Sequence, residues 1–199
     1  MRLSVLSAIF AAAGVLSAPT PSESEQTSSN GLPASTVVQN IQVLTTKSNA
    51  LIGPAQQLSI VNAPLLSIGQ GPWPTVITGL ADIVITATSA ITAMNNAPGG
   101  QGTPYVGDEA TAIGNAFRTF VRVHQQLLGV LIGKAGFLTQ IPFVGPPVAE
   151  VLRQVEGVVD TISFALIDGV EDSVASVMKG DLAGLDGTIK VAIAQYGGV

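Results

Sequence analysis

The chain has 199 residues, of which 11% are charged and 47% are hydrophobic, and its formal net charge is −5 at neutral pH. Ordinary soluble domains carry charge on about a quarter of their positions, so this chain offers unusually few charged groups to water. Its acidic balance without a basic cluster argues against a nucleic-acid partner, and the absence of cysteine excludes disulfides, thiol catalysis and thiolate metal sites.

Residues 1–18 have the pattern of a secretory signal peptide. Arg2 supplies the positive charge, and an apolar run extends from Leu3 to Leu16. Small residues follow this run and precede Pro19, which is the arrangement of a cleavage site. We therefore expect a secreted protein that is extracellular or resides in a cell wall.

The remainder of the chain divides into a leader and one folded domain. Residues 19–33 are rich in Ser, Thr and Pro and have no apolar periodicity, so we expect a flexible leader. The folded domain is expected over residues 34–197. Beyond the N-terminus no run approaches the roughly 18 uninterrupted apolar residues of a membrane span, so no transmembrane segment is expected.

The first helix is predicted to begin at Ser35 or Thr36, either of which can cap it. Gly53 and Pro54 are expected to interrupt this helix and to start a continuation. The residues expected to face inward along these two pieces are Val37, Ile41, Leu44, Leu51, Leu58, Val61 and Leu65.

A second helix is predicted from about Pro74 to Met94. Its outer face is unusual because it carries hydroxyls where most surface helices carry Lys and Glu. Trp73, between two prolines, is a candidate for lining a cavity mouth; the alternative is that it plugs one end of the domain. The outer residues are Thr75, Thr78, Asp82, Thr86 and Ser89.

Three further helices are predicted in the C-terminal half. Asp108 and Glu109 suit the start of a third helix, where the helix dipole favours negative charge. A fourth begins near Pro146 and continues for about 30 residues, and a fifth begins after Gly180. No strand alternation is sustained, so the fold class is a single-domain, all-α bundle of about five amphipathic helices. The inward residues of the third helix are Ile113, Phe117, Phe120, His124, Leu127 and Leu131.

His124, the only histidine, lies on an apolar stripe. It is either a neutral core histidine bonded to a neighbouring helix or a polar group that meets the head of a ligand. Ser163 is a second candidate for that polar group. We predict that the ligand-binding residues are Trp73, Ile113, Phe117, Phe120, His124, Leu127, Val155, Ile162, Ser163 and Leu166.

Motifs of catalysis are absent from the sequence. It contains no G-x-S-x-G, Walker, H-E-x-x-H or G-x-G-x-x-G pattern. The acidic pairs near Glu171 and Asp181 are typical of solvated helix and cap residues. We therefore expect no enzymatic activity, no metal site and no cofactor.

The sequence resembles the fungal family of hydrophobic-surface-binding proteins and cell-wall galactomannoproteins over residues 35–196. The resemblance is carried by Thr36–Lys47, by the Thr/Ser/Ala-rich segment Ile83–Met94 and by Leu182–Tyr196. Residues 121–136 depart from the family, which indicates a divergent subgroup. The resemblance implies a secreted or wall-associated helical bundle; some members hold lipids between helices, and others adsorb to hydrophobic solids and recruit hydrolases.

Three functions follow as hypotheses, of which the third is a secreted effector that engages a host protein. The first is binding of a fatty acid or similar apolar ligand in a cavity between helices. Burial of a 16-carbon chain is worth on the order of 12 kcal/mol before association costs. The alternative is a cell-wall or extracellular protein that adsorbs to hydrophobic surfaces. A continuous apolar void of about 300 Å³ or more would favour the first function.

Overall fold

The structure is a computed structural model of the chain and describes residues 31–62, 65, 69–97, 102–139, 141 and 145–197. The predicted signal peptide and residues 19–30 of the predicted leader lie outside the described residues. The described part is a single all-α domain, as predicted, and shows no β-strand beyond one isolated bridge. Its elements are α1 (Ala34–Gln57), the short 3-10 helix η1 (Ile60–Asn62), α3 (Pro72–Asn95), α4 (Gly107–Leu138), α5 (Gly145–Asp168) and α6 (Asp172–Gly197).

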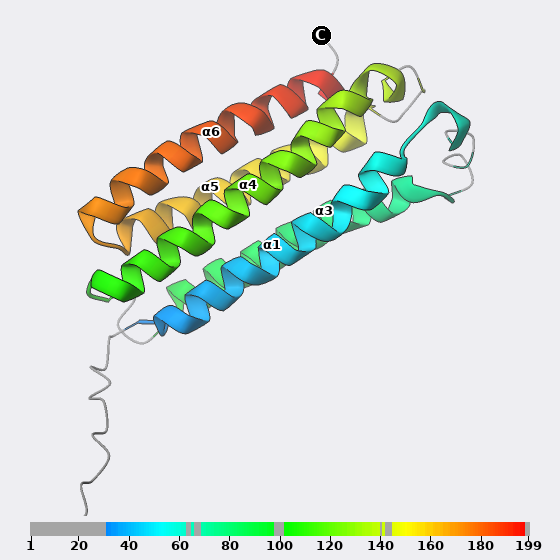
Figure 1. Cartoon of the computed structure of the whole chain (residues 1–199). Coiled ribbons are helices and arrows are strands. Elements are labelled where there is room, and N and C mark those ends of the chain that lie inside the picture. The colour runs from blue at the N-terminus through cyan, green and yellow to red at the C-terminus, as the bar shows by residue number, and fades with distance from the viewer. Residues whose placement is uncertain are drawn as a thin grey trace, which may run out of the picture.

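The five α-helices pack as a closed ring, and Figure 1 shows them lying side by side along one common direction. Each helix packs mainly against two others, in the order α1, α4, α6, α5, α3 and back to α1. Helices α4 and α5, although consecutive in the chain, touch only marginally across the middle. Helices α1, α4 and α6 run in one direction, and α3 and α5 run in the other. This arrangement turns one face of every helix toward a common interior.

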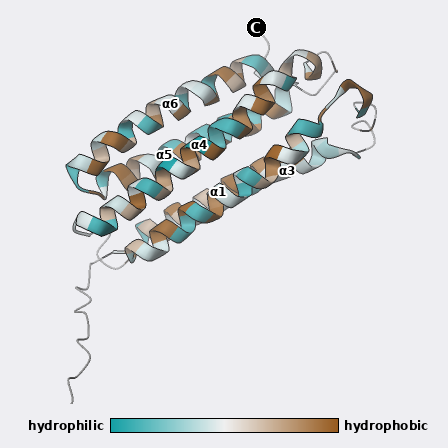
Figure 2. Ribbon diagram, viewed as in Figure 1, coloured by the Kyte–Doolittle hydropathy of each residue, from teal (hydrophilic) through white to brown (hydrophobic). Residues whose placement is uncertain are grey.

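Apolar residues at helical spacing fill this interior. Apolar and polar residues alternate along each helix (Figure 2), and the buried set draws on all five helices. Among its largest fully buried side chains are Phe117, Phe120 and Tyr196. The Tyr196 hydroxyl donates a hydrogen bond to the Leu131 carbonyl oxygen at 2.7 Å, which ties the end of α6 to α4. The apolar periodicity of the sequence is therefore what closes the ring.

The first helix differs from the prediction at both ends. It begins at Ala34, and neither Ser35 nor Thr36 caps it, because Pro33 occupies the cap position. Pro54 lies inside α1, which continues to Gln57. A proline in a helix removes one backbone hydrogen bond, and burial of Ile52 and Ala55 on either side of it holds the helix together. The expected continuation is replaced by η1, and Val61 is exposed rather than inward.

The break between the last two helices also differs from the prediction. Helix α5 ends at Asp168, whereas α6 begins at Asp172 and runs through Gly180. Tyr105 causes the break, because its N–H donates to the carbonyl oxygen of Gly169 at 2.8 Å and its carbonyl oxygen accepts from the N–H of Glu171 at 3.0 Å. These bonds take the place of helical bonds, so a residue far away in the sequence decides where the chain turns.

Candidate functional site

A polar pair lies inside the apolar ring. His124 on α4 and Ser48 on α1 are both fully buried, and 2.9 Å separates the imidazole Nδ1 from the serine Oγ. The ring of Phe120, one turn earlier on α4, lies 5.3 Å from the imidazole between ring centres. Helices α1 and α4 run side by side in the same direction, which brings the two residues to the same level. The pair bridges two helices in the middle of the domain.

Burial decides the protonation state of this histidine. Desolvation penalises the charged imidazole and lowers the pKa of His124 to about 4. The side chain is therefore neutral at pH 7, and one of its nitrogens bears the proton. Its Nε2 atom has no hydrogen-bond partner among the described residues, and neither has the buried Oγ of Ser163 on α5. The interior thus contains two neutral polar atoms, His124 Nε2 and Ser163 Oγ, that have no hydrogen-bond partner among the described residues.

The structure places all ten predicted ligand-binding residues in the buried interior. Phe117 and Phe120 contact each other with ring centres 6.5 Å apart. Trp73 lies at the beginning of α3, and Ile113 lies near the beginning of α4, so the two mark opposite ends of the ring. The predicted set therefore extends along the interior. The ten buried residues are Trp73, Ile113, Phe117, Phe120, His124, Leu127, Val155, Ile162, Ser163 and Leu166.

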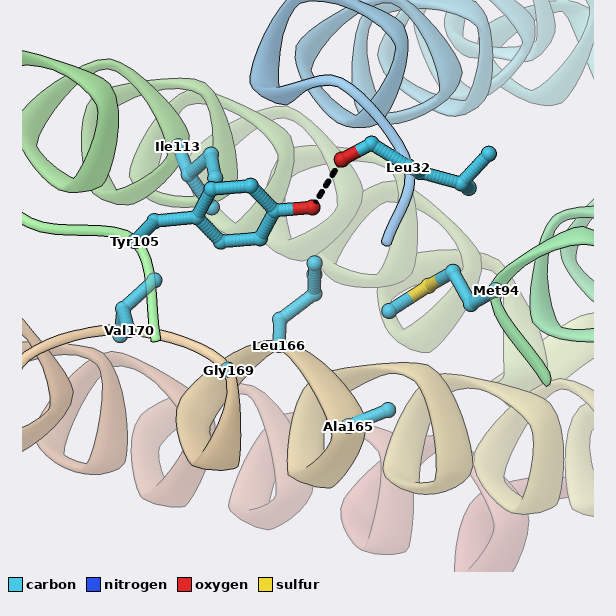
Figure 3. Close-up of a pocket in the computed structure, with 8 residues that line it drawn as sticks. All are labelled: Leu32, Met94, Tyr105, Ile113, Ala165, Leu166, Gly169 and Val170. Atoms are coloured by element: carbon cyan, nitrogen blue, oxygen red, sulfur yellow. Dashed lines mark hydrogen bonds between the residues drawn. The ribbon is translucent and has the colours of Figure 1, made fainter. Parts of the chain in front are cut away.

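An apolar pocket opens at the end of the ring where α4 begins and α5 ends (Figure 3). Its volume is about 20 Å³, which is close to the space of a single water molecule. This pocket is far smaller than the void of about 300 Å³ that would favour lipid binding. An acyl chain therefore needs side chains or helices to move before it can be accommodated there. The lining residues are Leu32, Met94, Tyr105, Ile113, Ala165, Leu166, Gly169 and Val170.

Tyr105 forms one wall of this pocket and fastens the chain that precedes α1. Its hydroxyl donates a hydrogen bond to the Leu32 carbonyl oxygen (Figure 3). Burial, and then the negative charge of Glu109, raises the pKa of Tyr105, so its phenol is neutral at physiological pH. With its backbone bonds to the turn after α5, Tyr105 ties three segments together at this end of the ring.

Sequence reasoning found part of this site. Ile113 and Leu166 were predicted ligand-binding residues and both line the pocket. Ser48, Leu32 and Tyr105 were missed. Ser48 could have been found because it lies one turn beyond Leu44 on the apolar stripe of α1. Nothing local marks Leu32 or Tyr105, whose positions depend on distant segments.

The described residues do not point to metal chemistry. They contain no group of three or more His, Asp or Glu side chains that could hold a metal ion. The salt bridges that the structure describes lie between side chains at or near the surface, such as Arg118 with Asp181 at 3.1 Å. The described interior, by contrast, contains apolar side chains and the neutral polar groups of Ser48, His124 and Ser163.

Comparison with known proteins identifies the fold. No protein-family model and no curated protein matches the sequence. The solved structures of Afmp4p with palmitic acid and of ligand-binding domain 2 of the Penicillium marneffei MP1 protein with multiple arachidonic acids share the fold. The first has a TM-score of 0.60 at 15% identity and covers 82% of this chain and 99% of that one. The second has a TM-score of 0.64 at 19% identity, with coverages of 83% and 94%.

Ligand-binding domain 1 of the same MP1 protein, solved with arachidonic acids, gives a similar result. Its TM-score is 0.61 at 18% identity, and it covers 81% of this chain and 95% of that chain. The five-helix architecture is therefore shared with three domains that were solved with fatty acids. At these identities the likeness concerns the fold, and membership in the family of hydrophobic-surface-binding proteins stays a prediction.

Proposed function

We propose that the protein is a secreted, non-catalytic binder of fatty acids or similar apolar molecules, held between the helices of the ring. The observation that carries this proposal is the interior itself, a ring of five helices with an apolar lining and only neutral polar groups. Three solved domains with this fold contain fatty acids. No described residue group offers a metal site, and the sequence contains none of the catalytic motifs considered above.

The energetics favour an apolar chain as the ligand. Burial of about 15 methylenes contributes roughly 12 kcal/mol, and the costs of association and ordering consume a large part of it. Micromolar affinity requires about 8 kcal/mol, so binding in that range leaves about 4 kcal/mol for association, ordering and the opening of the filled interior. His124 Nε2 or Ser163 Oγ would orient the polar head, because each is buried without a partner.

Ligand uptake requires the ring to open. The pocket of about 20 Å³ beside Tyr105 is an apolar gap in the lining, and we propose that the ligand chain enters there. Met94, Ala165 and Leu166 come from α3 and α5, so a small separation of these two helices would lengthen the gap along the interior. Apolar packing between the two helices would then give way to apolar packing against the ligand.

A matched pair of variants tests this site. Ala165→Trp fills the pocket from its wall, whereas Ala183→Trp adds the same side chain on the exposed outer face of α6. After delipidation, palmitic acid should raise the melting temperature of the parent chain and of Ala183→Trp, and native mass spectrometry should show one or two bound molecules. Ala165→Trp should bind at least about tenfold more weakly. Absence of bound lipid together with absence of stabilisation by added fatty acids contradicts the proposal.

Adsorption to hydrophobic solids is the second candidate function, and the outer face of α3 favours it. Among the described helices, α3 alone is long and apolar enough, by length and composition, to cross a membrane, and 28% of its most apolar stretch is buried. Its exposed hydroxyls point back to their own helix: Thr78 donates to the Pro74 carbonyl oxygen and Ser89 to that of Ile85. These hydroxyls need little water, and Ile85 on the same helix is 65% exposed.

Polymer beads test the second function. Adsorption that persists in high salt, where charge interactions are strongly screened, would support it, and elution by salt would show electrostatic attachment instead. Recruitment of hydrolases would appear as a higher hydrolysis rate on beads coated with the protein. Fractionation of the producing cells and their medium tests the proposed location in the medium or cell wall.

A further inference from the structure

Among the described residues of the connection between α1 and α3, three aliphatic side chains are exposed. Ile60 and Val61 on η1 are 72% and 90% exposed, and Leu65 is 39% exposed. We call these three residues the apolar tip. It lies beyond the C-terminal end of α1, at the end of the ring that is opposite the Tyr105 pocket, and it is visible as a hydrophobic turn in Figure 2. Single exposed apolar residues are common on protein surfaces, but Ile60 and Val61 are adjacent and together form a small apolar patch.

Ile60 and Val61 lie on a turn whose backbone is held by hydrogen bonds to a polar side chain. The side chain of Asn62 accepts a hydrogen bond from the N–H of Ser59 at 3.0 Å and donates one to the Gln57 carbonyl oxygen at 2.6 Å. Leu58, immediately before the turn, is buried in the core. The turn is thus fastened on its inner side by a polar side chain and by Leu58. The aliphatic side chains of η1 are held outward by this arrangement.

Charge is distributed so that the two ends of the ring differ. The connection between α1 and α3 carries no charge, because no charged residue occurs between Lys47 and Asp82, and these two side chains pair with each other. The described charged residues near that end are Lys134 near the end of α4 and the ion pair of Glu150 with Arg153 near the start of α5. The opposite end of the ring, where α4 and α6 begin and α5 ends, is acidic. The acidic residues of that end are Asp108, Glu109, Asp168, Glu171 and Asp172.

From this arrangement we propose that the apolar tip inserts into the surface of an uncharged or zwitterionic lipid assembly. Insertion of aliphatic side chains at a lipid–water interface requires apolar area and tolerates little buried charge. Within α1, α3 and their connection the sequence has only two charged residues, Lys47 and Asp82, which pair with each other away from the tip. The net charge of −5 repels anionic lipids. A protein partner is disfavoured because the tip has no Trp, Tyr or Arg, the residues that usually anchor protein interfaces.

Insertion also gives the molecule an orientation. With the tip in the lipid, the acidic end and the Tyr105 pocket point away from the surface. Lys134 on α4 lies beside the base of the tip, where its ammonium donates to the Gln56 carbonyl oxygen at 2.9 Å. It is therefore positioned near the level of lipid phosphates. The inference concerns a different part of the molecule from the ligand site and does not depend on the proposed function.

A single labelled cysteine tests the insertion, because the chain has no cysteine of its own. The chain used begins at Pro19, which retains every contact described above and removes the apolar run between Leu3 and Leu16. Val61→Cys and, as a matched control on the outer face of α6, Val177→Cys are labelled with an environment-sensitive dye. With phosphatidylcholine vesicles, the label at position 61 should shift to the blue and brighten, and the label at position 177 should not.

A second comparison uses loss of apolar area. Ile60→Ser combined with Val61→Ser should lower the vesicle partition coefficient at least about tenfold, because full burial of one such side chain is worth more than a factor of ten. Val177→Ser combined with Val191→Ser removes two half-exposed aliphatic groups from α6 and should leave partitioning unchanged. Circular dichroism should show equal helix content in all of these proteins.

Several results would overturn the inference. One is a label at position 61 that remains water-exposed with phosphatidylcholine, and another is equal partitioning of the two double variants. Binding only to anionic vesicles would show attachment by charge. A dye shift that appears without vesicles and grows with protein concentration would show that a second copy of the chain covers the tip.

Discussion

His124 should make the stability of the bundle depend on pH by an amount that follows from its burial. Its pKa falls from the ordinary value of 6.5 to about 4 on folding, so the unfolded chain binds more protons than the folded chain between these values. The contribution to stability is fully present above pH 6.5 and is lost as the pH falls toward 4. The loss amounts to about 2–3 kcal/mol at pH 4.5 and to about 3 kcal/mol below pH 4.

The variant that isolates this effect is His124→Leu, which keeps most of the side-chain volume and removes the titration. Ser48 then loses its partner, but its hydroxyl can bond to a backbone carbonyl one turn earlier on α1. Urea unfolding at pH 7 and pH 4.5 gives the free energy of unfolding of both proteins. Acidic groups titrate in both, so we expect the parent chain to lose about 2–3 kcal/mol more than the variant.

Ser48→Ala is a second variant, which keeps His124 and removes its hydrogen bond to Ser48. The buried imidazole then has no partner on either nitrogen, and we expect a loss of about 1–2 kcal/mol at pH 7. The difference in stability between the two pH values should persist in this variant.

Equal losses of stability between pH 7 and pH 4.5 in the parent chain and in His124→Leu would refute the reasoning, because they would mean that His124 titrates normally in the folded protein.

Three further substitutions test the packing, each by urea unfolding at pH 7. Tyr196→Phe removes the buried hydrogen bond to the Leu131 carbonyl and should cost about 1–2 kcal/mol; an unchanged midpoint would mean that water replaces the hydroxyl. Gly79→Ala adds a Cβ only 2.2 Å from Leu51 Cδ2, so the buried Leu51 side chain must shift. We expect the cost of this shift to cancel the gain of about 1 kcal/mol in helix propensity; a stabilisation of about 1 kcal/mol would contradict this close approach. Tyr105→Phe removes the bond to the segment before α1 and should cost about 0.5–1.5 kcal/mol, whereas a larger loss would indicate that the hydroxyl holds more than that segment.

The sequence predicted the number and the faces of the helices well because apolar spacing along a helix is a local property. The stripe of the third predicted helix from Ile113 to Leu131 is buried as expected. The predicted breaks were less accurate. Pro54 did not end its helix because packing on both sides compensates for one lost hydrogen bond, and the break after Asp168 is imposed by Tyr105, which is distant in the sequence.

In the candidate site, too, local features could be predicted from the sequence and contacts between distant segments could not. Burial of His124 could be predicted from its position on an apolar stripe, and the alternative of a neutral core histidine bonded to a neighbouring helix agrees with its contact to Ser48. The identity of that partner depends on the register of α1 against α4, which no local pattern specifies. The pocket beside Tyr105 likewise combines residues from five parts of the chain.

By itself, then, the order of apolar and polar residues determined an all-helical, charge-poor domain with an apolar interior and a single buried histidine, because each of these depends on neighbours within a few turns. The closed order of the helices around the ring, the Ser48–His124 pair, the filled interior and the outward-facing apolar tip were decided only by tertiary structure. Each of these depends on how segments far apart in the chain fit against one another, and side-chain volumes and registers settle that fit only when all five helices meet.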